Sequence, residues 1–170
     1  RKSSRCQLKG SRCQLQPSIW QLPRQSVNIR PCSATITKIR VFAMSVKFDH
    51  QFNASADQLW AIVGTPDRVD WVPGAASCTF DGEVRSLSLP GAGDIKERIL
   101  SRDPEQRTME YSCFETPAPL ESHHASMQVV ANADGCRLIW ETAVTPVAFE
   151  TFIRSSMEGC IEKISEILSN

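Results

Sequence analysis

The chain has 170 residues and a formal net charge of zero, with 19 Lys and Arg balanced by 19 Asp and Glu. The balance hides an uneven distribution. Residues 1–43 hold 9 of the basic side chains and none of the acidic ones, which leaves residues 44–170 with a net charge of −9. An acidic domain without a basic cluster is a poor nucleic-acid binder, and no apolar run is long enough to cross a membrane.

Residues 1–43 lack the periodicity of a helix or a strand and are rich in Arg, Ser and Gln. Segments of this kind without acidic residues are typical of organelle transit peptides, and IRVFAM at 39–44 resembles a plastid processing site. The alternative is a leader upstream of a start at Met44. Under either interpretation we expect a disordered segment outside the fold. The transit peptide predicts a plastid protein, and the leader predicts a cytoplasmic one.

Regular patterning begins after this segment. Alternating apolar and polar residues predict a strand over 46–52. A helix should follow, because Ser55 and Gln58 have the spacing of a capping box, and it should end at Gly64. A Thr-Pro pair comes next, with the residue types of a helix cap and a first helical position, so we expect a second short helix over about 66–73.

Six further strands are predicted between turn residues such as Asp-Gly, Pro-Gly and Asp-Pro. They are expected at about 76–81, 84–89, 94–102, 107–115, 122–131 and 135–144. Residues 146–168 then place apolar side chains three and four positions apart, which predicts an amphipathic helix of about six turns. This order predicts one α+β domain over 44–170, with the long helix covering one face of a seven-stranded antiparallel sheet.

The strands at 84–89 and 94–102 each place a charge on their apolar face. Arg85 shares a face with Leu87, and Glu97 shares a face with Ile99. Opposed residues of a hairpin lie on the same face, so Arg85 should be opposite either Glu97 or Ile99. Opposed or diagonal side chains lie within about 5.5 or 8 Å at Cβ, so both registers allow an ion pair. The pair is either a structural salt bridge near a rim or sheet edge, or a recognition or catalytic device in a ligand cavity.

The sequence contains no metal-binding or cofactor motif. Its seven cysteines include no C-x-x-C pair, and the four in the domain have positions that favour buried reduced thiols. His123 and His124 are neighbours in a strand and point to opposite faces, so we expect a cavity-wall His123 and a solvated His124. No P-loop, dinucleotide fingerprint or G-x-S-x-G motif occurs, so no cofactor is expected.

Several stretches between residues 46 and 168 resemble the START-like (SRPBCC) superfamily, in particular its polyketide cyclase/dehydrase branch, which includes the plant lachrymatory factor synthases. The stretches are ADQLW, DWVPG, CTFDGEVRSL, KERILSRDPEQRTMEYS, HHASMQV and GCRLIWETAVTP. The resemblance implies a helix-grip (START/Bet v 1-like) fold with a deep apolar cavity between sheet and long helix. It also implies that Arg85 and Glu97 match the proposed catalytic pair of the synthases. The chain differs from the synthases in a shorter PGAG turn and in His123, where a Tyr is usual.

Two functions are compatible with these features. The first is binding of a small hydrophobic molecule such as a lipid, isoprenoid, polyketide or aromatic metabolite, with Arg85 meeting a carboxylate, hydroxyl or carbonyl. The alternative is a cofactor-free cyclase, dehydratase or isomerase in which Glu97 transfers a proton and Arg85 stabilises an oxyanion. No nucleic-acid partner is expected, and we favour a monomer. The expected ligand contacts are Trp60, Trp71, Phe80, Leu87, Ile99, Met109, Tyr111, His123, Met127, Trp140, Phe152 and Met157.

Overall fold

A computed structural model gives the structure of residues 45–89 and 91–170. The predictions for residues 1–43 lie outside the described residues. The transit peptide, the alternative leader and the localisation that each implies therefore stay predictions. Among the described residues, no helix combines the length and the apolar character that a membrane crossing requires.

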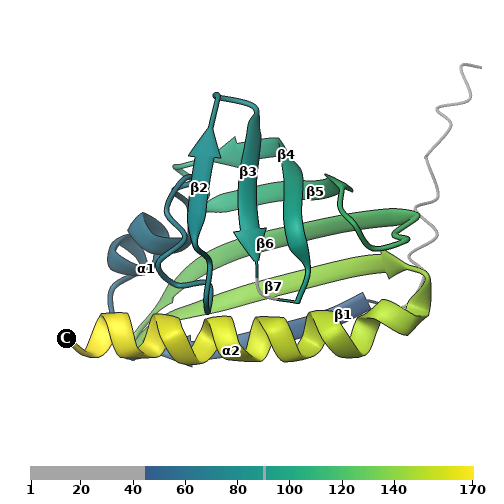
Figure 1. The fold of residues 1–170 in the computed structure, drawn as a ribbon. Coiled ribbons are helices and arrows are strands. Elements are labelled where there is room, and N and C mark those ends of the chain that lie inside the picture. The colour runs from purple at the N-terminus through teal and green to yellow at the C-terminus, as the bar shows by residue number, and fades with distance from the viewer. Residues whose placement is uncertain (1–44, 90) are drawn as a thin grey trace, which may run out of the picture. The chain divides into compact units, whose positions relative to one another are not determined.

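The described residues form a seven-stranded antiparallel sheet with a long helix along one face (Figure 1). The elements are β1 (Ser45–Phe52), α1 (Ala56–Val63), β2 (Ser77–Phe80), β3 (Val84–Leu89), β4 (Gly93–Asp103), β5 (Thr108–Glu115), β6 (Ser122–Asn132), β7 (Gly135–Thr145), the 3-10 turn η1 (Val147–Phe149) and α2 (Glu150–Ser169). The strand order is β1-β7-β6-β5-β4-β3-β2, so β1 pairs with β7 and every other neighbour is consecutive in the chain. The predicted α+β helix-grip fold is confirmed.

Helix α1 begins at the predicted capping box. The Gln58 N–H donates to Ser55 Oγ at 3.2 Å, and the Ser55 N–H donates to Gln58 Oε1 at 3.0 Å. These two bonds satisfy amides that have no partner inside the helix. The helix ends at Gly64, where a side chain would not fit because a Cβ there would lie 2.4 Å from the Trp60 ring.

The second short helix was predicted wrongly. The chain between α1 and β2 forms separate turns, closed by bonds from the N–H of Arg68 to the Thr65 carbonyl and from the N–H of Val72 to the Val69 carbonyl. These bonds do not continue into a helical ladder, and Pro73 has no N–H with which to extend one. The turns bury Trp71, which is 1% exposed and donates its indole N–H to the Arg68 carbonyl at 2.8 Å.

The C-terminal helix follows the predicted pattern, with η1 as an extra 3-10 turn at its start. Its buried side chains are Met157, Cys160, Ile161 and Ile164. Each of them lies three or four residues from two of the others, so the four share one face of the helix. This face joins the buried side chains of α1 and of β5, β6 and β7 in one core. Near β3 and β4, the same side of the sheet is not filled.

Candidate functional site

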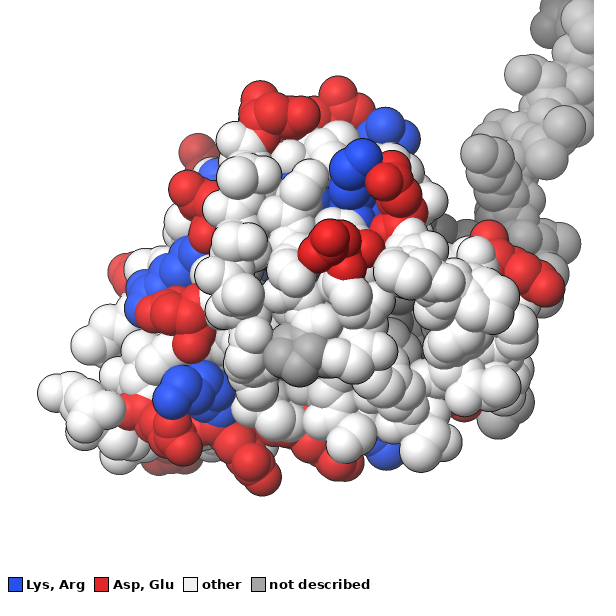
Figure 2. Space-filling view, viewed as in Figure 1, with Lys and Arg blue, Asp and Glu red and all other residues white. Residues whose placement is uncertain are grey.

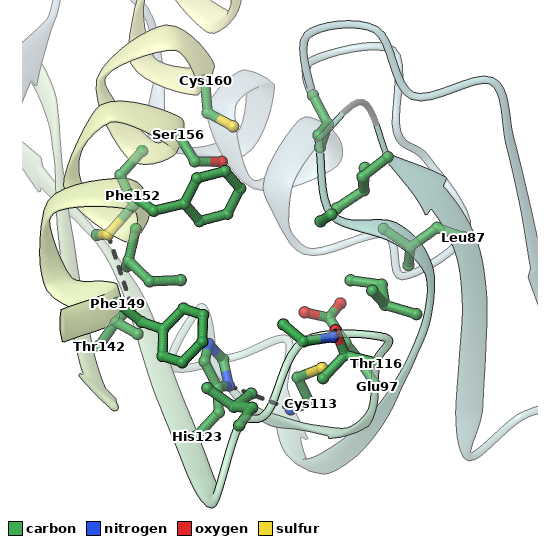
Figure 3. Close-up of a pocket in the computed structure, with 18 of the residues that line it drawn as sticks. Leu87, Glu97, Cys113, Thr116, His123, Thr142, Phe149, Phe152, Ser156 and Cys160 are labelled. Carbon is green, nitrogen blue, oxygen red and sulfur yellow. Dashed lines mark hydrogen bonds between the residues drawn. The ribbon is translucent and has the colours of Figure 1, made fainter. Parts of the chain in front are cut away.

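A cavity of about 430 Å³ lies between the sheet, the turns before β2 and the first half of α2 (Figure 3). Most of its lining is aliphatic or aromatic, with Leu87 and Ile95 on the sheet side and Phe149, Ile153 and Met157 on the helix side. Among the described residues of its wall, Arg85 and Glu97 are the two that carry a formal charge. Small-molecule sites typically have volumes of roughly 300–1,000 Å³, apolar walls and few polar groups.

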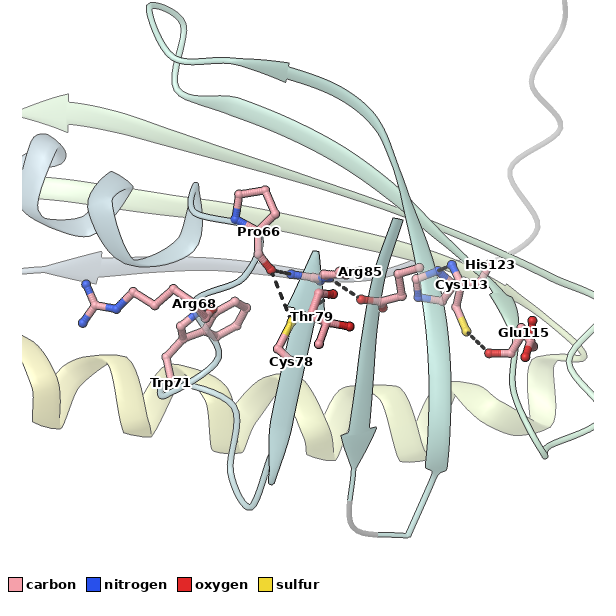
Figure 4. A network of polar contacts seen from close by, with 10 residues as sticks. Pro66, Arg68, Trp71, Cys78, Thr79, Arg85, Cys113, Glu115 and His123 are labelled. Carbon is pink, nitrogen blue, oxygen red and sulfur yellow. Dashed lines mark hydrogen bonds and ion pairs between the residues drawn. The ribbon is translucent and has the colours of Figure 1, made fainter. Parts of the chain in front are cut away.

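Arg85 and Glu97 form a buried ion pair on this wall (Figure 4). They are directly opposed in the register of β3 and β4, which selects the first of the two predicted registers. The Nε–H of Arg85 donates to Glu97 Oε2 at 2.6 Å, and the two residues are only 4% and 7% exposed. The hairpin therefore places the two charges side by side, where each neutralises the other.

Two further contacts hold the guanidinium of Arg85. Its Nη1 donates to the Pro66 carbonyl at 3.4 Å, and its plane lies over the Tyr111 ring with Cζ 4.8 Å from the centroid. Burial alone would lower the pKa of Arg85, but the nearby Glu97 carboxylate raises it above its ordinary value. Arg85 therefore remains a cation. The Pro66 contact also ties the turns after α1 to the cavity wall.

The Glu97 carboxylate has one oxygen to spare. Oε2 accepts from Arg85, and no described residue donates a hydrogen bond to Oε1. The register of β4 against β5 shifts between Lys96 and Glu97. Irregularities of this kind re-aim side chains, and Figure 3 shows the carboxylate directed into the cavity. A bound molecule can therefore donate a hydrogen bond to Glu97 or lose a proton to it.

His123 closes a gap between β5 and β6. The regular pairing of these strands stops at Tyr111 and Ala125. Beyond that point, the Cys113 N–H donates to His123 Nδ1 at 3.1 Å, and Ser112 Oγ donates to the His123 carbonyl at 2.5 Å. Side-chain bonds thus replace ladder bonds where the two strands separate.

These bonds also assign the protonation of the imidazole. Because Nδ1 accepts from Cys113, the hydrogen of a neutral His123 ring is on Nε2. Burial lowers the pKa of His123, and the charge of Arg85 adds to this effect while Glu97 opposes it. Figure 3 shows the ring on the cavity wall with its second nitrogen away from Cys113. His123 therefore offers the cavity a neutral N–H donor.

The remaining polar groups of the wall are also neutral. Burial raises the pKa of the Tyr111 phenol, and it raises the pKa of Cys113 to about 11 and that of Cys160 to about 12. Neither cysteine is therefore a thiolate, the nucleophilic form, near neutral pH. The buried Nε1–H of Trp140 makes no hydrogen bond with full geometry, although the indole is near enough to the phenol to oppose the rise in the Tyr111 pKa.

Three segments surround the mouth of the cavity: the β3–β4 turn, the β5–β6 loop and the start of α2. A Cβ on Gly93, whose φ is 76°, would lie 3.0 Å from Pro117 in the loop. A Cβ on Gly91 would lie 3.9 Å from Phe152 in the helix, so the turn reaches both of the other segments. Phe152 is 47% exposed, and Figure 2 shows few charged side chains around this turn.

The structure brings together some of the predicted site residues and separates others. Those on the cavity wall are Arg85, Glu97, Trp71, Leu87, Tyr111, His123, Trp140, Phe152 and Met157. Those away from the wall are Trp60, Phe80, Ile99, Met109 and Met127. Trp60, Met109 and Met127 fill the core under α1 instead, with Ile99 packed against that core, and Phe80 is on the short edge strand β2. Whether the wall residues bind a ligand stays a prediction.

Several wall residues were not predicted. Ile95 has the same parity as Glu97, and Phe149 and Ile153 have the spacing of the helix face, so periodicity was a sufficient signal for these three. The side chains of the β5–β6 loop had no periodic signal. Histidine, cysteine and carboxylate side chains do not gather in groups of three or more that suit a metal within the described residues.

The sequence from 43 to 168 matches the family model described as "Polyketide cyclase / dehydrase and lipid transport". The chain belongs to this family. The match confirms the superfamily and the branch that the sequence resembles. A comparison with curated proteins gave no match.

Solved structures of similar fold come from bacteria and from a plant. The protein XoxI from Bacillus cereus has a TM-score of 0.69 at 20% identity, covering 75% of this chain and 97% of that one. An uncharacterised protein from Bacillus thuringiensis has a TM-score of 0.68 at 21% identity, covering 75% and 100%. Norcoclaurine synthase from Thalictrum flavum has a TM-score of 0.60 at 21% identity, covering 75% and 87%. At these identities the similarity shows a shared fold and no more than that.

Proposed function

We propose that the protein binds a small hydrophobic molecule in the cavity between β3–β7 and α2. The observation that carries the proposal is an apolar cavity of about 430 Å³ with a single ion pair on its wall. Burial of a ligand's apolar surface supplies the affinity, at about 25 cal/mol for each Å² removed from water. The few polar groups fix the orientation.

Native mass spectrometry of protein purified from its own source tests this proposal. We expect a fraction of the protein to carry a small molecule that is released on denaturation. A bare protein mass would contradict the proposal if the same preparation also fails to bind an added uncharged apolar dye such as Nile red.

Neighbouring serines on α2 give a matched pair of variants. Ser156 lines the cavity, whereas Ser155 does not, and both are exposed, so that a larger side chain is tolerated at either position. Ser156→Trp should fill the space and reduce dye or ligand binding by about tenfold or more. Ser155→Trp should bind like the parent protein. Equal binding by the two variants would place the ligand elsewhere.

A second candidate function is a cofactor-free cyclase, dehydratase or isomerase. The open Oε1 of Glu97 beside the permanently charged Arg85 favours it. Glu97 would accept a proton from the substrate, and Arg85 together with the His123 N–H would stabilise the negative charge that develops on a substrate oxygen.

Glu97→Gln separates the two functions, because it removes the base and preserves the shape of the side chain. If the protein is an enzyme, this variant should still take up the molecule that co-purifies with the parent protein but should no longer convert it, as liquid chromatography of the released molecule would reveal. Conversion at the parent rate by a folded Glu97→Gln protein would exclude Glu97 as the base.

A further inference from the structure

The charge balance of the cavity limits what it can hold. Arg85 and Glu97 cancel each other, and no other formally charged side chain of the described residues reaches the wall. His123, Tyr111 and the two wall cysteines are neutral near neutral pH. The cavity as a whole therefore has a net charge of zero.

A charged ligand would find no free counter-ion there. The Arg85 guanidinium already meets Glu97 on one edge, the Pro66 carbonyl on another and the Tyr111 ring on its face. A carboxylate would have to displace Glu97 or lie near it, and an ammonium group would have the same conflict with Arg85. Moving an ion from water into an apolar cavity without a new partner is unfavourable.

Neutral polar groups find partners more easily. The neutral imidazole of His123 presents its Nε2–H to the cavity. Glu97 Oε1 is the matching acceptor for a hydroxyl. A carbonyl oxygen can accept from His123, and a hydroxyl can accept from His123 or donate to Glu97.

We infer that the ligand is an uncharged molecule, with an apolar body and a carbonyl or hydroxyl oxygen as its polar end, and that the cavity rejects carboxylates and amines. This inference rests on the proposed function, because it names the class of molecule that the same cavity binds. Of the three ligand groups expected opposite Arg85, it keeps the hydroxyl and the carbonyl and excludes the carboxylate.

Three probes of equal chain length test the inference: 2-decanone, decanoate and decylammonium, titrated calorimetrically into the full chain near neutral pH. Tryptophan fluorescence gives a second readout, because Trp71 and Trp140 line the cavity. We expect 2-decanone to bind at least about tenfold more tightly than either ion. Equal or tighter binding of an ion would overturn the inference and leave the proposed function intact. Binding of none of the three would overturn both.

Charge variants provide the control. Glu97→Gln leaves the Arg85 charge unbalanced, so decanoate should gain affinity and the preference should invert. The double variant Arg85→Gln with Glu97→Gln is neutral again and should prefer 2-decanone. Circular dichroism checks that each variant is folded. If the single variant does not fold, the double variant decides, and preferential binding of decanoate by it would overturn the inference.

Discussion

The sheet face that α2 covers has the same alternation of inward and outward side chains at both ends. One end is packed into the core, whereas the other borders a cavity. At one end, Trp60 of α1 joins Met109 and Met127 in a continuous core. At the other, Arg85 and Glu97 face a cavity that the turns before β2, the β5–β6 loop and the start of α2 enclose. The comparison shows that alternation decides which side chains point inward, whereas the covering segment decides whether the space they face is filled.

The largest expected effect comes from breaking the ion pair at the open end. Glu97→Leu leaves Arg85 buried without its partner, so the free energy of unfolding in urea should fall by about 3–5 kcal/mol. Replacing both residues, as Arg85→Met with Glu97→Leu, should restore it to within about 1 kcal/mol of the parent protein or above. A single variant as stable as the parent would mean that water solvates Arg85 fully.

The same truncation at both ends compares their packing. Leu59 of α1 is 0% exposed in the filled core, whereas Leu87 lies on the cavity wall. Leu59→Ala should lower the free energy of unfolding by about 3–5 kcal/mol, because the void it leaves has no room to relax. Leu87→Ala should lower it by about 2 kcal/mol, at the lower end of the usual range, since its side chain already borders empty space. Equal losses in urea unfolding would contradict the difference in packing.

Acidification should lower the free energy of unfolding through His123, which lies on the cavity wall. Burial, Arg85 and His124 lower the pKa of His123, while Glu97 opposes them. A folded-state pKa below the unfolded value of about 6.5 means that the unfolded chain takes up the proton first. The contribution of His123 to the free energy of unfolding is therefore complete above about pH 6.5, and it is lost as the pH falls through the folded-state pKa.

His123→Asn isolates this effect, because its amide oxygen can still accept from the Cys113 N–H but does not titrate. Urea unfolding near pH 7.5 and near pH 5.5 should show a smaller loss of stability in this variant than in the parent protein. Equal losses of stability in the variant and the parent protein would mean that folding does not lower the pKa of His123.

The smallest effect is expected one residue from Glu97 on the opposite face of β4. Lys96 pairs with Glu115, but their side chains are 44% and 58% exposed, so solvent screens the attraction. Lys96→Met should change the free energy of unfolding by less than about 1 kcal/mol. A loss as large as that of Glu97→Leu would contradict the distinction between the two faces.

The ion pair could be predicted from the sequence because two local rules determine it. Alternation turns Arg85 and Glu97 inward, and the parity of a hairpin register keeps them within reach of each other. The capping box at Ser55 was equally local and is confirmed. Features that depend on residues close in the chain were thus accessible without a structure.

Features that depend on how segments cover the sheet could not be predicted from the sequence. Nothing in the sequence distinguishes Met109, under α1, from Tyr111, on the cavity wall, because both have the same parity in β5. The hydrogen bond from Cys113 to His123 requires β5 and β6 to separate, and no pattern marks where they do. The second short helix was predicted wrongly for a related reason, since Trp71 packs against Trp140 and the Pro66 carbonyl accepts from Arg85, and both contacts are with residues distant in the chain.

Methyl NMR of methionine-labelled protein during a titration with 2-decanone tests the central claim most directly. Met157 lines the cavity, whereas Met109 and Met127 lie in the filled core. The account predicts a large, saturable shift of the Met157 methyl signal and little change at the other two. Shifts centred on Met109 and Met127, with Met157 unmoved, would contradict it.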